Sequence, residues 1–247
     1  MAASESPMAA AYQCKLLNRA EVAEGTMAFY FEKPSPFDFK PGQSADLTLS
    51  NPDTDSEGNT RTFSIASPPF ENHLMFATRM RDTAFKRSLR KAPLGTQVKV
   101  DPPAGSFTLH KNSSNAAVLL AGGIGITPFL SIVRQADHDA LPHKLHLFYC
   151  NRRPEDAPFL DVLPMLEKTN PNFQLVCAMT QMSKSKKEWK GETGLINHEM
   201  LSRHLTNLQG PIYYIAGPPT MVAGLRKMLV AANVDEDDIR TEDFAGY

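Results

Sequence analysis

A glycine-rich turn between an apolar run and a helical pattern is the segment of this sequence best suited to bind a phosphate group. In AAVLLAGGIGITPFLSIVR (116–134), the run 118–120 predicts a buried parallel strand, and Gly122, Gly123 and Gly125 let a ligand approach the main chain. Pro128 suits the first turn of the helix that follows, where unpaired amides attract an anion. The spacing is not GxGxxG and lacks the lysine of a P-loop, so a purely structural glycine turn is the alternative at this point.

Cysteine and histidine give no comparable signal. Cys14, Cys150 and Cys177 are far apart and odd in number, which favours reduced core residues and excludes a conventional iron-sulfur site built from this chain alone. The seven histidines form no ligand pair beside an acid, so we expect no metal site.

Composition indicates an ordinary globular protein. The 247 residues are 42% hydrophobic and 21% charged, with a formal net charge of -1. The sequence therefore lacks the strong excess of positive charge that is typical of proteins that bind nucleic acid or an acidic membrane. No run approaches the roughly 20 apolar residues of a spanning helix, and the first residues do not resemble a signal peptide. We therefore expect a cytoplasmic protein, either a monomer or a homodimer.

The length, and a change from short strand-like segments to alternating strands and helices, predict two domains, 1–111 and 112–247. The first has short segments rich in β-formers, separated by Pro and Gly, which predict an antiparallel sandwich or barrel. Its expected strands are 12–17, 26–31, 44–49, 61–66, 73–78 and 97–100, with one helix at 83–91 and an exposed hairpin loop at 51–60.

The second domain alternates apolar strands and helices, which predicts a doubly wound parallel α/β sheet. The expected strands are 116–121, 145–149, 174–179 and 212–216, followed by helices that start at Pro128, Pro158, Asn197 and Pro219. Ligands bind such sheets beyond the carboxyl ends of the strands, so the glycine turn and the later Gly217-Pro218-Pro219 are expected to face one site.

Four segments, taken together, resemble the ferredoxin:NADP reductase family of flavoenzymes over nearly the whole chain. They are RTFS (61–64), GGIGITP (122–128), AGPPTM (216–221) and EDFAGY (242–247), in this order. The resemblance implies a Greek-key barrel that binds flavin and an α/β domain that binds the nicotinamide nucleotide. FAD is expected rather than FMN, because relatives with a covering C-terminal aromatic residue mostly use FAD.

The resemblance also implies roles for the barrel residues. Arg61 should pair with a flavin phosphate, Phe63 should lie against the isoalloxazine where the family usually has Tyr, and Ser64 should reach the flavin N5 edge. The alternative for RTFS is a plain barrel strand with an exposed arginine. Further expected flavin contacts are Thr62, Thr78, Arg79, Met80, Thr83, Phe85 and Lys86.

In the second domain, the resemblance places the nucleotide pyrophosphate at the glycine turn, with Thr127 near the flavin as well. Gly217, Pro218, Pro219 and Met221 are the other expected nucleotide contacts, and Ala216 stands where many relatives have Cys. Arg152 or Arg153 could meet a 2′-phosphate or could simply be solvated. Lys184, Lys186 and Lys187 add positive charge on the expected adenosine side, which favours NADPH.

At the C-terminus, Phe244 and Tyr247 are expected to cover the flavin face, and with Ser64 they are the expected catalytic residues. An aromatic plug in the domain interface is the alternative.

The resulting hypothesis is an FAD-dependent NAD(P)H oxidoreductase that passes electrons to a separate carrier such as ferredoxin or flavodoxin. Alternatives are a free-flavin, ferric or quinone reductase, an electron-transfer component of a larger oxygenase or redox complex, and a binding module without flavin. The cationic residues Arg81, Lys86, Arg87, Arg90 and Lys91 form either a solvated helix face or a docking surface for an acidic carrier.

Overall fold

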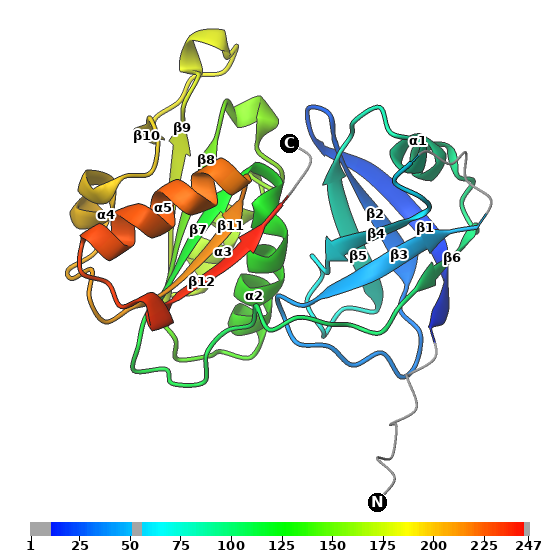
Figure 1. Ribbon diagram of the computed structural model, residues 1–247, viewed down its shortest axis with the longest axis horizontal. Helices are drawn as coiled ribbons and strands as arrows, with labels where there is room; N and C mark the ends of the chain where they lie inside the picture. The colour runs from blue at the N-terminus through cyan, green and yellow to red at the C-terminus, as the bar shows by residue number, and fades with distance from the viewer. Residues whose placement is uncertain (1–10, 51–55, 245–247) are drawn as a thin grey trace, which may run out of the picture.

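The computed structural model describes residues 11–50 and 56–244, which fold into an antiparallel barrel and an α/β half that lie side by side (Figure 1). This two-part architecture confirms the predicted fold class.

The barrel is built from six antiparallel strands in the order β4-β3-β6-β1-β2-β5. The strands are β1 (Tyr12–Ala23), β2 (Thr26–Glu32), β3 (Ser44–Leu49), β4 (Thr60–Ser64), β5 (His73–Arg79) and β6 (Gln97–Val100). Alternating apolar residues fill its interior, as in β3, where Ala45, Leu47 and Leu49 are buried. The outermost strands β4 and β5 approach each other where the rings of Phe63 and Phe76 lie 6.3 Å apart. One helix, α1 (Ala84–Lys91), follows β5 and covers one end of the barrel.

The α/β half contains a parallel sheet in the order β10-β9-β8-β7-β11-β12. Its strands are β7 (Ala117–Gly122), β8 (Leu145–Asn151), β9 (Phe173–Met179), β10 (Glu192–Thr193), β11 (Ile212–Gly217) and β12 (Ile239–Asp243). The helices are α2 (Ile126–His138), α3 (Leu163–Thr169), α4 (His198–His204) and α5 (Pro219–Ala231). The core on one face includes α2 and α3, and that on the other includes α4 and α5. The strand order reverses at β7, so the carboxyl ends of β7 and β11 meet where such sheets bind ligands.

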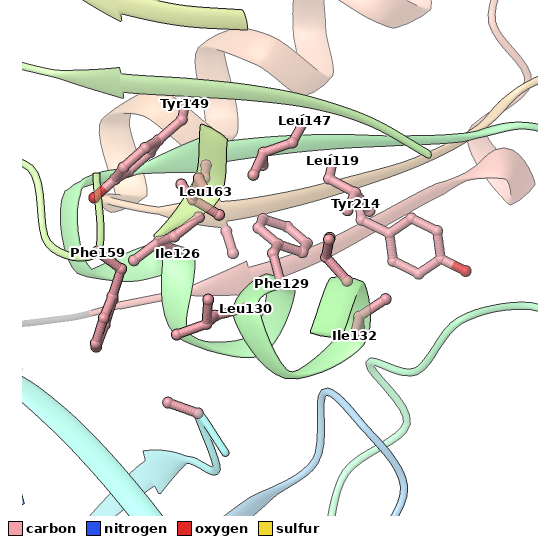
Figure 2. Packing of buried hydrophobic residues seen from close by; sticks show 14 of the residues in the cluster. Leu119, Ile126, Phe129, Leu130, Ile132, Leu147, Tyr149, Phe159, Leu163 and Tyr214 are labelled. Carbon is pink, nitrogen blue, oxygen red and sulfur yellow. The ribbon is translucent and has the colours of Figure 1, made fainter. Parts of the chain in front are cut away.

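Helix α2 is packed between the sheet and the barrel. Its Phe129 ring points toward sheet residues such as Leu119 and Leu147 (Figure 2), and Ile126 and Leu130 belong to the same buried cluster. The same apolar cluster includes barrel residues such as Ala28, Met75 and Phe107. Polar contacts also join α2 to the barrel: the Ser131 hydroxyl donates to the Ser67 carbonyl at 2.8 Å, Arg134 pairs with Glu71, and the Phe70 amide donates to the Gln135 side chain at 3.4 Å. The two halves therefore share one buried helix.

Several element boundaries differ from the sequence predictions. The helix expected from Pro158 begins at Leu163, because Phe159 adopts a left-handed φ of 61°, which interrupts a right-handed helix. The first strand extends to Ala23, and the short β10 and the polar β12 were not predicted. The described part of the connection between β3 and β4 joins two antiparallel neighbours, which confirms a hairpin there.

The three cysteines are unpaired, and Cys14 and Cys150 are buried, as predicted. No helix among the described residues is both long and apolar enough to cross a lipid bilayer.

Candidate functional site

A cleft of about 470 Å³ lies between the two halves and receives side chains from both. We call it the interdomain cleft. Its lining residues are Ser44, Glu57, Arg61, Thr62, Phe63, Ser64, Ala77, Thr78, Arg79, Arg81, Thr83, Lys86, Ile124, Thr127, Glu242, Asp243 and Phe244. Strand β4, the start of α1, the turn after β7 and the end of β12 therefore meet at one place.

Ser64 is the last residue of β4, lines this cleft and is only 4% exposed. Its hydroxyl oxygen is buried and has no hydrogen-bond partner among the described residues. A buried hydroxyl normally has a partner, since leaving it unpaired costs free energy. Ser64 thus presents an unused donor and acceptor to whatever molecule occupies the cleft.

Arg61 precedes Ser64 on the same strand and is held in place by the chain around it. Its guanidinium donates to the Glu57 carboxylate at 2.7 Å and to the Glu57 and Thr60 carbonyls at 2.8 Å, and it lies 5.2 Å from the centre of the Phe85 ring. Glu57 is 62% exposed, so this ion pair is weak enough for an incoming anion to replace it. The carbonyl contacts and the Phe85 ring hold the Arg61 guanidinium in one orientation, in which it can bind a phosphate.

Other cations strengthen the positive potential at this wall. Burial, together with the nearby charges of Arg81 and Arg61, lowers the pKa of Lys86, whose ammonium donates to the Arg79 carbonyl at 2.8 Å. The first turn of α1 begins here with Thr83 as its N-cap, whose side chain accepts from the Lys86 amide. Four cationic residues and a helix N-terminus around one concavity favour a phosphorylated ligand.

The remaining predicted barrel residues divide into two groups. Thr62, Thr78, Arg79 and Thr83 line the cleft, whereas Met80 and Phe85 do not. Phe85 is fully buried behind Phe63, with ring centres 6.0 Å apart, and Met80 packs against the barrel core. Phe63 itself lines the cleft while packing on Phe85 and Phe76. Phe85 therefore supports the Phe63 ring from behind.

Glu242 is a site residue that the sequence analysis did not select. It lies on β12 opposite Ala216 of β11 and lines the interdomain cleft. Burial raises the pKa of its carboxyl to about 7, and the atom Oε2 has no hydrogen-bond partner among the described residues. A carboxyl group that titrates near neutrality in a cleft can hold or release a proton there. The signal available in the sequence was its place in EDFAGY, one of the four segments that carry the family resemblance.

The glycine turn owes its composition largely to close packing. A Cβ on Gly125 would lie 2.2 Å from the Ala216 carbonyl oxygen, and one on Gly122 would lie 2.3 Å from the Met221 sulfur. Gly123 has a φ of 52°. The glycines thus allow the turn after β7 to pass against the end of β11, and Gly122, Gly123 and Pro218 from the two turns line one cleft.

Thr127 and Phe244 bring the α/β half into the interdomain cleft. Thr127 is 1% exposed, and its hydroxyl donates to the Ile124 carbonyl at 3.0 Å. The Phe244 amide donates to the Gly217 carbonyl at 2.9 Å, which fixes the end of β12 beside the end of β11. Phe244 lines the cleft and also packs on the α/β core, so both roles weighed for it are compatible with its position. Tyr247 lies outside the described residues.

A second cleft of about 460 Å³ lies at the carboxyl ends of the parallel strands; we call it the strand-end cleft. It is lined by Arg79, Arg81, Gly122, Gly123, Cys150, Asn151, Arg152, Asp156, Thr180, Leu195, Pro218, Thr220 and Met221. Arg79 and Arg81 line both clefts, so the two adjoin. Of the predicted nucleotide contacts, Gly125, Gly217 and Pro219 line neither cleft.

The two arginines after β8 have different environments. Arg153 makes a bidentate bond to Asp156, at 2.8 Å for both contacts, and also pairs with Glu24 of the barrel at 2.8 Å. Arg152 is exposed and faces the strand-end cleft. Of these two arginines, therefore, only Arg152 faces the strand-end cleft.

These features fit a phosphorylated cofactor. The interdomain cleft supplies cations at one end and an unpaired buried hydroxyl and carboxyl elsewhere, while the adjoining cleft has glycines and arginines suited to a dinucleotide. Arg61, Lys86 and Ser64 are the residues that could hold a flavin nucleotide.

Comparisons with known proteins agree with this geometry. Residues 119–227 match the family described as the oxidoreductase NAD-binding domain, a range that includes α2 and most of β7 and α5. The reductase component of propane 2-monooxygenase from Mycolicibacterium smegmatis is 27% identical over 86% of this chain and 61% of its own length. The reductase component of glycine betaine monooxygenase from Chromohalobacter salexigens is 25% identical over 89% of this chain and 60% of its own length. The chain thus spans less than two thirds of either relative.

Among solved structures, a ferredoxin NADP⁺ reductase from Neisseria gonorrhoeae with bound FAD and NADP has the same fold. It superposes with a TM-score of 0.76 at 22% identity, over 94% of this chain and 98% of that one. The likeness covers the barrel and the α/β half together.

Proposed function

We propose that this chain is a member of the ferredoxin:NADP reductase-like flavoproteins, and that it oxidises NAD(P)H with a bound FAD and delivers the electrons to a separate protein. The observation that carries this proposal is the meeting of two clefts at Arg79 and Arg81, one walled by the barrel and one at the strand ends. Two cofactors must approach each other for hydride transfer, and adjoining clefts provide for that.

The proposed division assigns flavin to residues 1–111 and the nicotinamide nucleotide to residues 112–247. FAD, when bound, accepts a hydride from the nicotinamide and can release the electrons one at a time. Arg61 and Lys86 bind the phosphates, and Phe63, supported by Phe85, provides an apolar wall for the ring system.

Three residues from the two halves supply the remaining chemistry. The Ser64 hydroxyl is the hydrogen-bonding group at the reacting edge of the ring, because it is buried in the cleft without another partner among the described residues. Glu242 holds a proton near neutral pH close to that edge. Phe244 excludes water from the cleft until the nucleotide enters.

NADPH is the proposed donor, and Arg152 is the residue that would recognise its 2′-phosphate. The support is that Arg152 faces the strand-end cleft, whereas Arg153 is occupied by Asp156 and Glu24. Replacing Arg152 with Ala should raise the KM for NADPH and leave that for NADH unchanged. Equal KM values for the two nucleotides in the unaltered protein would overturn the preference.

Ferredoxin or flavodoxin is the proposed class of acceptor, and the cytoplasm is the proposed setting. Three unpaired cysteines are compatible with a reducing compartment.

The test is to purify the protein, identify any released flavin, and follow flavin reduction by NADPH and NADH under anaerobic conditions. Steady-state rates are then measured with ferredoxin, flavodoxin, 1,4-benzoquinone, ferric citrate and free flavin. A protein that binds no flavin, even after incubation with FAD, would contradict the proposal. Rapid reduction of quinone, ferric ion or free flavin, with no reduction of either protein, would assign one of the small-molecule reductase functions.

A further inference from the structure

The exposed side of α1 and the residues before it carry an excess of positive charge. Between Arg79 and Lys91 the sequence has six cationic residues and one acidic residue, Asp82. Four of the cations are exposed at the surface: Arg81, Arg87, Arg90 and Lys91. We call these four the basic face.

The needs of the fold account for little of this charge. Arg87 pairs with Asp82, whose side chain is 87% exposed, so the pair is highly solvated. Arg90 and Lys91 have no ion-pair partner within the described ranges 11–50 and 56–244. They lie in the last turn of α1, where their charge also complements the helix dipole.

Two large apolar side chains lie beside the basic face. Leu94 is 59% exposed in the turn after α1, and Leu17 is 49% exposed on β1. The Gly95 amide donates to the Leu16 carbonyl at 2.8 Å, so this turn runs directly against β1. Exposed leucines bordered by cations resemble the apolar centre and charged rim of a protein interface.

The basic face is continuous with the interdomain cleft. Arg81 and Thr83 line the cleft, and α1 runs from there to Arg90 and Lys91 over eight residues, which is about 12 Å of helix. Figure 1 shows α1 at the end of the barrel toward which the C-terminal strand β12 points. A protein that docked on α1 would therefore lie beside the cleft proposed to hold the flavin.

We propose that the basic face, with Leu17 and Leu94, is the docking surface for an acidic protein that accepts electrons from the flavin. This inference rests on the proposed function. Charge complementarity selects an acidic partner, and the adjoining cleft gives such a partner a reason to dock at this end of the barrel. The positive potential would orient the acceptor before contact, and the leucines would provide the apolar contact area.

The test compares the double variant Arg90→Glu/Lys91→Glu with a control, Lys168→Glu/Lys227→Glu, which has the same change in charge on exposed positions of α3 and α5. None of the four residues lines either cleft. The acceptors are an acidic [2Fe–2S] ferredoxin, an acidic flavodoxin, the basic protein cytochrome c and the uncharged 1,4-benzoquinone, each at low and high ionic strength.

For the α1 variant we expect kcat/KM with the acidic proteins to fall by about tenfold at low salt, with the difference shrinking as salt is added. The rate with benzoquinone should not change, and the rate with cytochrome c should not fall. The control should lose much less.

Three results would overturn the docking assignment: equal losses in the α1 variant and the control, an equal loss with benzoquinone, or no reduction of either acidic protein by the unaltered enzyme. Salt-sensitive binding to anionic vesicles or RNA that the α1 variant alone loses, with acidic-protein kinetics unchanged, would also overturn it and assign the surface to that ligand. Failure of the proposed function is distinguishable, because NAD(P)H would then not reduce bound FAD at all.

Discussion

Ser64 and Glu242 line the same cleft from opposite halves of the protein, and each has a buried oxygen without a hydrogen-bond partner among the described residues. One ends a barrel strand, and the other lies on the outermost strand of the parallel sheet. Their side chains meet this cleft only when the two halves are packed together. The interface thus assembles the chemistry that neither half has alone.

The raised pKa of Glu242 makes stability depend on pH. Because its pKa is about 7 in the folded protein against 4.5 as the ordinary value, the folded state binds more protons than the unfolded state between these values. The free energy of unfolding should therefore fall as pH rises from about 4.5 to 7, by at most about 3 kcal/mol from this group.

Glu242→Gln should remove that loss, so the variant should be the more stable protein at pH 8 and differ little from the unaltered one at pH 5. Urea unfolding of flavin-free protein at both pH values measures this. A wild-type and variant difference that is the same at pH 5 and pH 8 would contradict the buried, protonatable carboxyl.

The Ser64 hydroxyl should matter more for activity than for folding. Ser64→Ala removes a buried oxygen that has no partner in the described structure, so flavin-free protein should be unchanged in stability or gain about 1 kcal/mol. Reduction of bound FAD by NADPH should slow by roughly 10- to 100-fold, as expected when one hydrogen bond to the reacting edge is lost. Stopped-flow absorbance under anaerobic conditions measures the step, and Ser67→Ala, on a buried serine outside both clefts, is the control. An unaltered reduction rate would exclude the role given to Ser64.

Arg61 and its partner Glu57 should affect flavin affinity in opposite directions. Arg61→Ala removes a charge-assisted contact to phosphate and should raise the Kd for FAD by about 10- to 100-fold. Glu57→Gln removes the carboxylate that now binds the Arg61 guanidinium at 2.7 Å, so FAD should bind equally well or more tightly. Fluorescence titration of flavin-free protein gives both constants. Weaker binding in both variants would mean that Glu57 is needed to orient Arg61 for phosphate.

The two closely packed glycines should respond differently to a methyl group. Gly125→Ala places Cβ against the Ala216 carbonyl, a backbone atom that can move little, and should destabilise the protein by about 2 kcal/mol or more. In Gly122→Ala the closest contact is with the sulfur of the flexible Met221 side chain, which can rotate toward the strand-end cleft, and Pro218 Cδ lies 3.0 Å away. Its stability should fall less, while its KM for NADPH rises. Thermal unfolding and steady-state kinetics separate the two effects, and a reversed order of stability would refute this account.

Phe244 should control access of the nicotinamide to the cleft. Phe244→Ala should tighten NADP⁺ binding and alter the visible spectrum of bound FAD, whereas Phe244→Trp should preserve the cover. Difference spectroscopy during NADP⁺ titration measures both effects. If the alanine variant loses stability but its spectrum and affinity stay the same, Phe244 serves as an interface plug.

The fold could be predicted from the sequence wherever buried elements have a regular pattern of apolar residues. Strands β7 and β11 are apolar along their length and β8 is largely apolar, because helices cover both faces of the sheet. Strand β12, Ile239–Asp243, is polar and lies at the sheet edge, where it pairs with β11 alone among the described strands. Because β12 was not predicted as a strand, Glu242 was not selected as a site residue. The rise in its pKa comes from burial, which the local sequence does not reveal.

Long-range partners account for the other gaps. Arg152 and Arg153 were indistinguishable in the sequence, and what separates them is an ion pair between Arg153 and Glu24, 129 positions away. Likewise, Gly125 looked like a ligand-contacting glycine, whereas its neighbour is a carbonyl on β11. Side-chain type and spacing in the sequence reduced the number of candidate site residues. Tertiary contacts in the structure then distinguished the residues that line a cleft from those that do not.

The position of α2 limits how this chain can be recombined with its relatives. A helix buried by the sheet on one side and by the barrel on the other belongs equally to both, and Ser131 and Arg134 bind barrel residues that follow β4. A chimera made by joining this barrel to a foreign α/β half would bring together two surfaces that were never selected to fit. A chimera should therefore keep this chain's barrel together with its own α2 and take only the rest of the α/β half from a relative. The nucleotide specificity of the relative could then be transferred without separating α2 from the barrel.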